Sequence, residues 1–306
     1  MNVQNIQRHT MKTQRIGQFS IDRVLESQGA FAAVDFVLPG VDLQKLKEQA
    51  SWLVPRFLNE QRQLMMSFHS FVLRTPRYNI LIDTCVGNDK ERPQRLGWHR
   101  QQYPYLQALA QVGLVPEQID FVCCTHLHAD HVGWNTCLRD GQWVPTFPKA
   151  RYVFSSAEYK HWESAHRHAL AQGQPVPNHG SFADSVLPVV DAGQAMMVEG
   201  GHDLDAGVRL EPAHGHTPGS CVLHARSGGE HAVFTGDILH TPVQLVDLSW
   251  SSRFCHDAQQ AARVRHDLVH QVADTSTLLM AAHFPNPVAG RVVSHSHGFR
   301  WHCHEH

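Results

Sequence analysis

The order of apolar and polar positions along the chain predicts a mixed α/β protein. Residues 15–26 alternate loosely between apolar and polar side chains, as an early strand does. Residues 67–75 and 79–87 predict a hairpin, because two apolar runs flank the turn sequence PRYN. A helical pattern, a short loop and the buried strand DFVCCTH follow between residues 103 and 126. This succession is the strand–helix–strand order of an α/β fold.

The second half of the chain continues this order. Apolar runs predict strands within 151–156, 208–226, 231–239 and 277–285, and amphipathic runs predict helices at 157–173 and 257–274. Residues 31–66 differ, because their apolar residues lie at near-helical spacing but Pro55 interrupts them, so we expect one or two short helices and a loop. With no internal repeat and no low-complexity linker, residues 1–306 are predicted to form a single α/β domain.

The composition adds no new element to the predicted fold, but it argues against some classes of partner. Hydrophobic residues make up 42% of the chain and charged residues 18%, with a formal net charge of -2, which is an ordinary globular balance. The near-neutral charge gives no reason to expect nucleic acid or an anionic membrane as a partner. No apolar run approaches the roughly 18–20 residues of a membrane-spanning helix.

Cysteine usage and the start of the chain bear on the cellular compartment. The chain has seven cysteines, an odd number without a C-x-x-C pair, which favours free thiols in a reducing compartment. Residues 1–27 contain no apolar run resembling a secretion signal. We therefore expect a cytoplasmic protein, with Met1 and Met11 as alternative starts of translation.

Histidine is over-represented, with 25 copies in the chain. The stretch THLHADH carries four metal-capable side chains within six positions: His126, His128, Asp130 and His131. His126 and His128 are two residues apart, so both rings point to the same side if the backbone is extended. Zinc in hydrolytic sites favours imidazole and carboxylate ligands and keeps a position for water. Because a two-metal site needs more ligands than this stretch supplies, others must come from elsewhere.

Three polar residues that end apolar runs are candidates for the missing ligands. His216 lies in the turn GHTPG, Asp237 ends AVFTGD and His283 ends LLMAAH. A buried carboxylate or imidazole is costly at such a position unless it is hydrogen-bonded or binds a metal ion. The three residues therefore extend the candidate metal site.

The motifs THLHADH, GHTPG, TGD and AAHFP, in this order and spacing, resemble those of the metallo-β-lactamase fold hydrolases. The resemblance covers most of the chain, from about residue 68 to beyond residue 283, and the motif H-x-H-x-D-H is very specific. It implies a four-layer αββα sandwich with metal ions at one edge of its two sheets. Two Zn²⁺ ions per chain are implied, the first held by His126, His128 and His216 and the second by Asp130, His131 and His283, with Asp237 bridging.

The resemblance also implies a supporting aspartate and a hydrolytic mechanism. Asp83 in NILIDTCVG matches the family's aspartate that orients ligand histidines, with a turn-capping aspartate as the alternative. A hydroxide that bridges the two ions would attack the substrate, with Asp130 and Asp237 as catalytic carboxylates. His128 stands where the related diiron flavoproteins carry glutamate, which favours hydrolysis over redox chemistry. Iron, manganese or cobalt in place of zinc stays open.

The stretch from TGDILHTPVQL to AAHFPNPVAGRV is similar to the branch of this family that contains acyl homoserine lactonases and methyl parathion hydrolase-like enzymes. The similarity implies a small, hydrophobic substrate, a lactone or ester, with phosphotriesters as a further class. Residues 31–66 would then form a lid-like insertion over that substrate. A glyoxalase II-like thioesterase is one alternative, and a non-catalytic metal-binding or sensor protein is an alternative of a different class.

Further candidates lie outside these motifs. His240, Trp250 and Phe254 are candidate residues of the substrate pocket, with a plain loop histidine and core packing as the alternatives. The His-rich C-terminal tail, 295–306, has the composition of a chelator, and a terminal strand with a frayed end is the alternative. A homodimer stays open.

Overall fold

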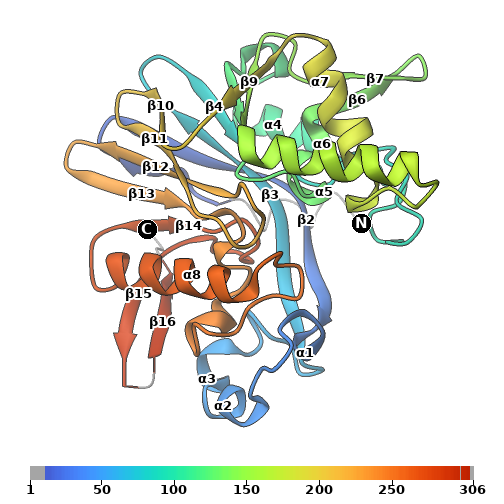
Figure 1. Cartoon of the computed structure of the whole chain (residues 1–306). Helices are drawn as coiled ribbons and strands as arrows, with labels where there is room; N and C mark the ends of the chain where they lie inside the picture. Colours follow the sequence, from blue (N-terminus) through green and yellow to red (C-terminus); the bar gives the residue numbers. More distant parts are fainter. Residues whose placement is uncertain (1–10, 297, 304–306) are drawn as a thin grey trace. The chain divides into compact units, whose positions relative to one another are not determined.

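The protein is built on two seven-stranded sheets, in a computed structural model that describes residues 11–296 and 298–303. The first sheet has the order β1-β2-β3-β4-β5-β8-β9, with β1 (Gln14–Ile16), β2 (Phe19–Ala33), β3 (Gln63–Arg74), β4 (Asn79–Ile82), β5 (Phe121–Cys123), β8 (Arg151–Ser155) and β9 (Ala195–Val198) (Figure 1). The second sheet follows chain order, with β10 (His202–Asp205), β11 (Val208–Pro212), β12 (Cys221–Ser227), β13 (Glu230–Phe234), β14 (Leu278–Met280), β15 (Ala289–His295) and β16 (Gly298–Cys303). Strands β6 (Thr136–Arg139) and β7 (Gln142–Pro145) form a separate hairpin.

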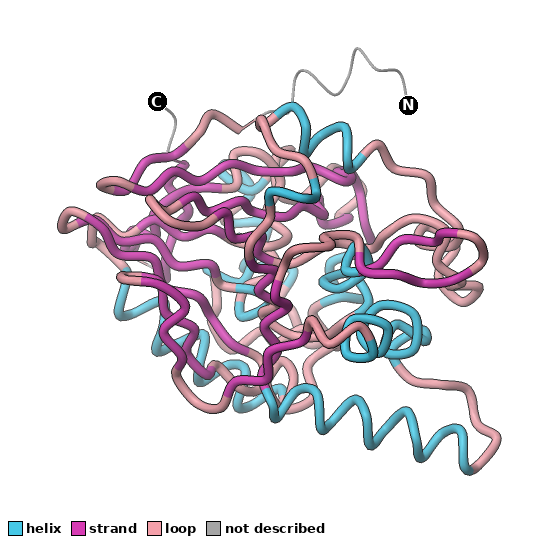
Figure 2. The backbone as a smooth tube through the Cα atoms, turned by 90° about the horizontal axis from the view of Figure 1, so that it is seen from above, coloured by secondary structure: helices cyan, strands magenta, loops and turns pink. Residues whose placement is uncertain are grey.

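The helices of the described residues are mostly short (Figure 2). They are α1 (Val34–Val37), α2 (Leu43–Glu48), α3 (Ala50–Leu53), α4 (Tyr105–Gln111), α5 (Ala129–Val132), α6 (Ser156–Ala171), α7 (Leu187–Asp191) and α8 (Ala258–Val272). The long helices α6 and α8 are capped at their N-termini by Ser155 and Asp257, whose side chains accept a backbone N–H of the first turn. Two sheets with helices confirm the predicted fold class. Within the described ranges, no helix has both the length and the apolar content needed to cross a membrane.

The chain divides into two compact units, each with its own core. Unit 1 consists of Met1–Gly17, Ser27–Ser67 and Asp203–His306, and unit 2 consists of Gln18–Glu26 and Phe68–His202. The single domain expected for residues 1–306 stays a prediction.

Unit 2 contains the predicted hairpin and the predicted strand–helix–strand order. β3 and β4 pair antiparallel with Phe71 opposite Ile82, and β4, β5 and β8 are parallel neighbours. Val72, Leu81 and Val122 of these strands are fully buried in one apolar cluster. β5 carries no charged or hydroxyl side chain, as expected of a parallel strand buried on both faces. The polar metal motif begins only where this strand has ended.

Unit 1 contains the segment predicted as a lid-like insertion, 31–66. The segment begins with the end of β2 and runs into β3, and it holds three short helices where one or two were expected. Its side chains Val37, Leu53 and Phe57 are buried in the same cluster as Trp250 and α8. Residues of this segment therefore build part of the core of unit 1, while their role as a lid stays a prediction.

The His-rich C-terminal tail belongs in part to the second sheet. β15 and β16 pair antiparallel with Gly290 opposite Cys303, and Trp301 between them is buried. His295 and His302 are exposed. The terminal strand considered as an alternative is therefore present, whereas residues 304–306, the predicted frayed end, lie outside the described residues.

A buried carboxylate in unit 2 holds two loops together. Glu26 of β2 accepts hydrogen bonds from Val86 N (3.1 Å), Gly87 N (2.9 Å) and Trp134 Nε1 (2.8 Å). Gly87 lies very close to Gly133. A Cβ at position 87 would be 2.7 Å from the carbonyl carbon of Gly133, which explains why residue 87 is a glycine. Burial raises the pKa of Glu26 to about 7, although the three donors act in the opposite direction.

We expect Glu26 to make the metal-free protein less stable as the pH rises from 5 to 8. The folded pKa of about 7 lies above the ordinary value of 4.5, so the stabilising contribution is complete below pH 4.5 and is lost as the pH passes 7. A shift of this size corresponds to about 3 kcal/mol. Urea denaturation at both pH values should show the unfolding free energy of the wild type falling relative to that of Glu26→Gln. A difference between the two proteins that is the same at both pH values would contradict the raised pKa.

Candidate metal centre

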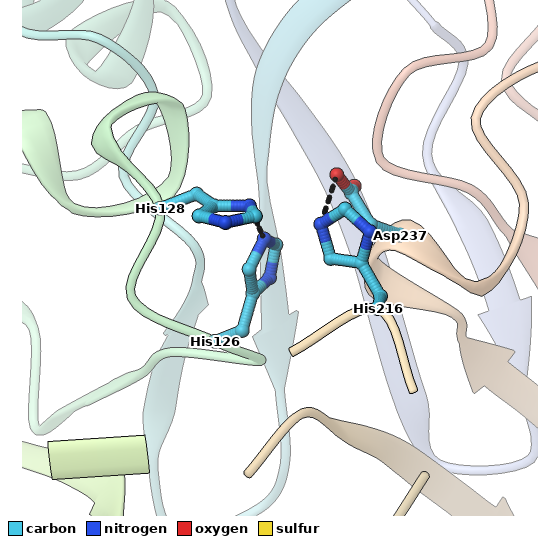
Figure 3. A group of neighbouring side chains, drawn as sticks. All are labelled: His126, His128, His216 and Asp237. Atoms are coloured by element: carbon cyan, nitrogen blue, oxygen red, sulfur yellow. Dashed lines mark hydrogen bonds and ion pairs between the residues drawn. The ribbon is translucent and has the colours of Figure 1, made fainter. Parts of the chain in front are cut away.

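The histidine motif of unit 2 lies in the loop between β5 and α5 and in α5 itself. His126 Nε2 and His128 Nδ1 face each other at 3.0 Å (Figure 3). A tetrahedral zinc ion with Zn–N bonds of about 2.0–2.1 Å holds two ligand nitrogens about 3.3 Å apart, so this separation fits one ion shared by both rings. His126 is buried and His128 half-buried, while Asp130 and His131 lie in α5.

Asp83 anchors this loop just beyond the end of β4. Its backbone φ of 54° lies in the left-handed region, which aspartate tolerates better than most residues. Its carboxylate accepts hydrogen bonds from Thr125 N (2.7 Å) and Thr125 Oγ1 (2.8 Å) and lies 2.8 Å from His131 Nδ1. Because an ionised carboxylate only accepts, His131 carries its proton on Nδ1 and presents Nε2 as the ligand atom. Thr125 Oγ1 also lies 3.2 Å from His126 Nδ1, so Asp83 reaches a second predicted ligand indirectly.

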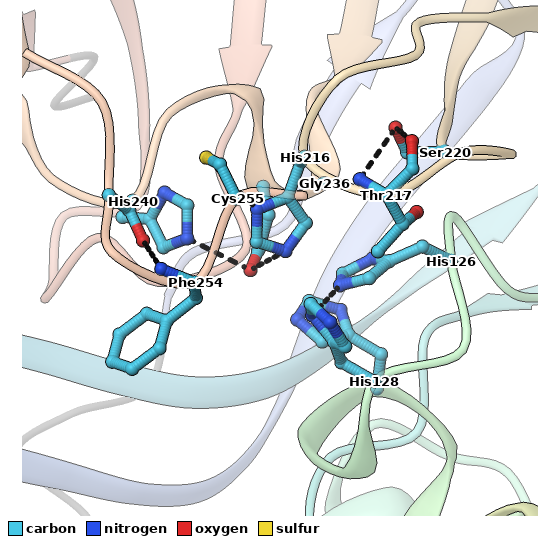
Figure 4. Close-up of polar contacts among 12 residues, drawn as sticks. His126, His128, His216, Thr217, Ser220, Gly236, His240, Phe254 and Cys255 are labelled. Atoms are coloured by element: carbon cyan, nitrogen blue, oxygen red, sulfur yellow. Dashed lines mark hydrogen bonds and ion pairs between the residues drawn. The ribbon is translucent and has the colours of Figure 1, made fainter. Parts of the chain in front are cut away.

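Unit 1 brings three histidines around one carboxylate. Asp237, in the turn Gly236–Ile238 that follows β13, has Oδ2 at 3.1 Å from His216 Nε2 (Figure 3). Its Oδ1 lies 3.1 Å from His283 Nε2. His240 Nε2 lies 3.2 Å from the same Oδ2 (Figure 4). None of the four side chains is more than 5% exposed. The sequence places these residues far apart, and the ends of β13 and β14 bring Asp237 and His283 together.

Hydrogen bonds on the opposite ring nitrogens fix two of these histidines. His283 Nδ1 lies 3.1 Å from Ser67 O, and Ser67 N donates to His283 O at 3.0 Å, so β3 holds this residue in place. His216 Nδ1 lies 3.6 Å from Cys255 Sγ. In both rings the contact on Nδ1 directs Nε2 to Asp237, as metal-ligating histidines are commonly oriented.

The electrostatics of this cluster fit a cation beside Asp237. Burial alone would lower the pKa of His216, but the Asp237 carboxylate raises it to about 9. Burial lowers the pKa of His240 to about 4, although Asp237 acts in the opposite direction. A buried carboxylate that faces several imidazole nitrogens is a donor set suited to a divalent metal ion, which compensates its charge without a proton.

The other predicted site residues take different places. His240, predicted as a pocket residue, lies within the Asp237 cluster. Trp250 is 5% exposed and belongs to the apolar core of unit 1. Phe254 is 37% exposed, with its ring centroid 6.4 Å from that of His240. The roles of Trp250 and Phe254 in a pocket stay predictions.

Two residues in contact with the histidine motif were not predicted from the sequence. Glu158 accepts a hydrogen bond from Leu127 N, and Asn178 bonds to the backbone of Leu127 and Ala129. Glu158 and Asn178 could not be recognised from the sequence. Their partners are backbone groups, which every residue has, so no pattern of side chains marks the contact.

A protein with this fold and these His/Asp clusters is a metal-dependent hydrolase. A family model described as the metallo-beta-lactamase superfamily matches residues 69–284, and the chain belongs to this superfamily. The match contains every predicted ligand and Asp83. No curated protein matches the chain.

Solved structures of low sequence identity share the fold over nearly the whole chain. One is described as hydrolase AbOPH in the beta lactamase superfamily, with TM-score 0.79 and 22% identity over 97% of this chain and 98% of that one. Another is AidC, described as a dizinc quorum-quenching lactonase in complex with a product, with TM-score 0.74 and 19% identity over 97% and 98%. A third is a probable metal-dependent hydrolase from Staphylococcus aureus, with TM-score 0.75 and 19% identity over 96% and 99%.

Proposed function

We propose that the protein is a dinuclear zinc-dependent hydrolase. In this proposal His126, His128 and His216 hold one ion, Asp130, His131 and His283 hold the other, and Asp237 bridges the two. The observation that carries the proposal lies within unit 1. Asp237 turns one carboxylate oxygen to His216 and the other to His283, two histidines assigned to different ions. A carboxylate with its oxygens divided in this way has the geometry that a bridging ligand needs.

The chain's own residues would have distinct tasks in such a reaction. Zinc ions, when bound, polarise the oxygen of the substrate and make water nucleophilic near neutral pH. Asp237 would hold His216 on one of its carboxylate oxygens and His283 on the other. Asp130 is half-buried in the first turn of α5, where its carboxylate would take the proton of the attacking water and return it to the leaving oxygen. His240 lies against Asp237 and would hold the orientation of its carboxylate.

We further propose lactones and carboxylic esters as the main substrate class, with phosphotriesters as a second. In both classes an electrophilic centre carries an oxygen that a metal ion can polarise and an oxygen leaving group. AidC is described as a lactonase with a product bound, and further solved relatives are described as N-acyl homoserine lactone hydrolases at 15% and 16% identity. Phe254, partly exposed beside His240, is an apolar contact for a small hydrophobic substrate.

The alternatives make different predictions. A glyoxalase II-like enzyme would prefer thioesters over oxygen esters and lactones. A metal-binding or sensor protein would bind zinc without turnover. All seven predicted ligands are present in the chain, which favours an enzyme over a protein that has kept the fold alone.

A substrate panel on the zinc-loaded full chain tests the proposal. We expect kcat/KM for N-acyl homoserine lactones and aryl esters to exceed that for thioesters and β-lactams by at least about tenfold, a difference of about 1.4 kcal/mol in transition-state binding. His295 and His302 should be replaced by glutamine in the protein used for metal counting, because both are exposed and would bind extra zinc. Turnover of thioesters or β-lactams alone would overturn the substrate class, and two bound zinc ions without any turnover would favour the sensor.

A further inference from the structure

His128 is held differently from the other histidines of its motif. Asp83 contacts His131 directly and reaches His126 through Thr125. The backbone of the residues on either side of His128, Leu127 and Ala129, is bonded instead by two residues far along the chain, Glu158 and Asn178. The backbone N–H of Leu127 donates to Glu158 Oε1 at 3.1 Å, and that of Ala129 donates to Asn178 Oδ1 at 3.0 Å.

Asn178 closes this arrangement with a second bond. Its Nδ2 donates to Leu127 O at 2.6 Å, so a single amide side chain bonds the residue before His128 and the residue after it. Asn178 has a φ of 52°, a left-handed conformation that asparagine adopts more readily than most residues. Its neighbour His179 is fixed through its carbonyl oxygen, to which the buried Arg92 donates at 3.0 Å. Arg92 is fixed in turn by two bonds to the Asp184 carboxylate, at 2.6 and 2.9 Å.

Glu158 holds the same loop from the first turn of α6. Its side chain is fully buried, and its Oε1 also accepts a hydrogen bond from Trp162 Nε1 at 2.6 Å. The Trp162 ring packs edge-on against the His128 ring, with centroids 5.5 Å apart. Helix α6 therefore supplies both the side-chain acceptor for a backbone N–H of the loop and an aromatic ring that packs against the imidazole of His128. A buried carboxylate is costly at a position where only packing is needed, so its acceptor role accounts for it better.

We propose that Glu158 and Asn178 are positioning residues for His128, fixing the backbone of Leu127 and Ala129 on its two sides so that His128 Nδ1 and His126 Nε2 face one shared metal ion. The inference rests on the proposed metal-binding function and adds two residues to its machinery. The hydrogen bond from Leu127 N to Glu158 and the paired bonds of Asn178 leave the loop one backbone conformation at His128. Without them His128 would have to be ordered by the ion itself, at the expense of affinity.

Asn178→Gly is the variant that separates positioning from folding. Glycine accepts a φ of 52° without strain, so the change removes both side-chain bonds and leaves the backbone conformation available. Asn88→Gly is the matched control, because Asn88 also accepts a backbone N–H (Tyr103, 2.7 Å) and donates to a carbonyl (Tyr103, 3.1 Å) in unit 2, so that both of its bonds go to Tyr103 and not to the histidine motif. Asn178→Asp keeps the acceptor for Ala129 N and puts a second acceptor oxygen in place of the donor to Leu127 O.

Zinc affinity of the full chain is measured by competition with a chromophoric chelator, and apo-protein stability by urea denaturation. We expect Asn178→Gly to weaken one of the two zinc sites by about 10–100-fold, as loss of a partner behind a ligand commonly does, with the other site within about threefold of wild type. Asn178→Asp should weaken the same site, and Asn88→Gly should bind zinc like wild type. A cobalt-loaded sample should show an altered absorption spectrum for the two Asn178 variants and an unchanged one for Asn88→Gly.

The outcomes separate the two proposals. Wild type that binds two zinc ions, together with an Asn178→Gly variant of equal affinity, would overturn the positioning role and leave the proposed function intact. Equal losses of affinity in Asn178→Gly and Asn88→Gly would also overturn it, because general loosening of unit 2 would then explain both. A wild-type protein that binds no zinc would overturn the proposed function and this inference with it. If Asn178→Gly fails to fold, Asn178→Asp, which keeps the size of the side chain, carries the same comparison.

Discussion

Replacing Asp237 by asparagine should lower kcat/KM on the best ester or lactone substrate by more than about 100-fold and reduce bound zinc from two ions to one or none. Loss of a group behind a metal ligand already costs about 10–100-fold, and a bridging ligand contacts both ions. An amide offers one oxygen and one NH₂ group in place of two anionic oxygens. Either His216 or His283, each 3.1 Å from a different oxygen, would then face a donor. Steady-state kinetics and metal analysis on the same protein preparation measure both effects.

Asp267→Asn is the matched control for this change. Asp267 also lies beside a histidine, with its Oδ1 3.3 Å from His266 Nδ1, but both side chains are largely exposed. We expect this variant to keep wild-type activity and zinc content. Full activity of Asp237→Asn with both ions retained would exclude a bridging role for Asp237.

Replacing Asp83 by asparagine should weaken zinc binding at the site of His131 by about 10–100-fold while the chain still folds. Asparagine tolerates the φ of 54° and its oxygen still accepts from Thr125 N. Its NH₂ group, however, replaces the oxygen that faces His131 Nδ1 at 2.8 Å. His131 must then accept at Nδ1 and carry its proton on Nε2, the nitrogen that should bind the metal ion. Zinc competition assays and the ring ¹⁵N shifts of His131 report both consequences.

Asp274→Asn controls for the change from carboxylate to amide. Asp274 also has a positive φ, 59°, and accepts a backbone N–H, from Ser294 at 2.9 Å. Its variant should bind zinc like wild type. If Asp83→Asn keeps wild-type affinity, or if its His131 retains the Nδ1–H tautomer, the supporting role of Asp83 is wrong.

The parts of the fold that sequence could predict are those with a clear apolar period. The hairpin of residues 67–87 corresponds to β3 and β4, and the amphipathic run 257–274 corresponds to α8. The long β2 was predicted only in part, as 15–26, because its second half, SQGAFAA, is half-exposed and shows no alternation. β15 and β16 were not predicted as a pair, since histidines and arginines occupy their outward positions and mask the buried Val292 and Trp301.

The candidate ligands could be predicted because metal chemistry restricts residue type, and family motifs place them. All of these residues are histidines or aspartates, the residue types that bind metal ions or support their ligands: the seven candidate ligands, Asp83 and His240. Glu158 and Asn178 could not be found in this way, because they act on the backbone of Leu127 and Ala129. Such contacts depend on where a helix and a turn pack, which no local pattern encodes. The segment 31–66 shows the same limit, since its apolar spacing does not tell which residues, such as Val37, Leu53 and Phe57, are buried in the core of unit 1. Its role as a lid stays a prediction.

The measurement that tests the dinuclear site most directly is anomalous scattering at the zinc edge from crystals of the zinc-loaded protein. We predict two peaks about 3.5–4 Å apart, one on each side of the Asp237 carboxylate, with His216 and His283 as ligands of different ions. His126 and His128 should be ligands of the ion that His216 binds, and Asp130 and His131 of the other. A single peak at Asp237, or zinc bound only at the exposed His295 and His302, would contradict a dinuclear site bridged by Asp237.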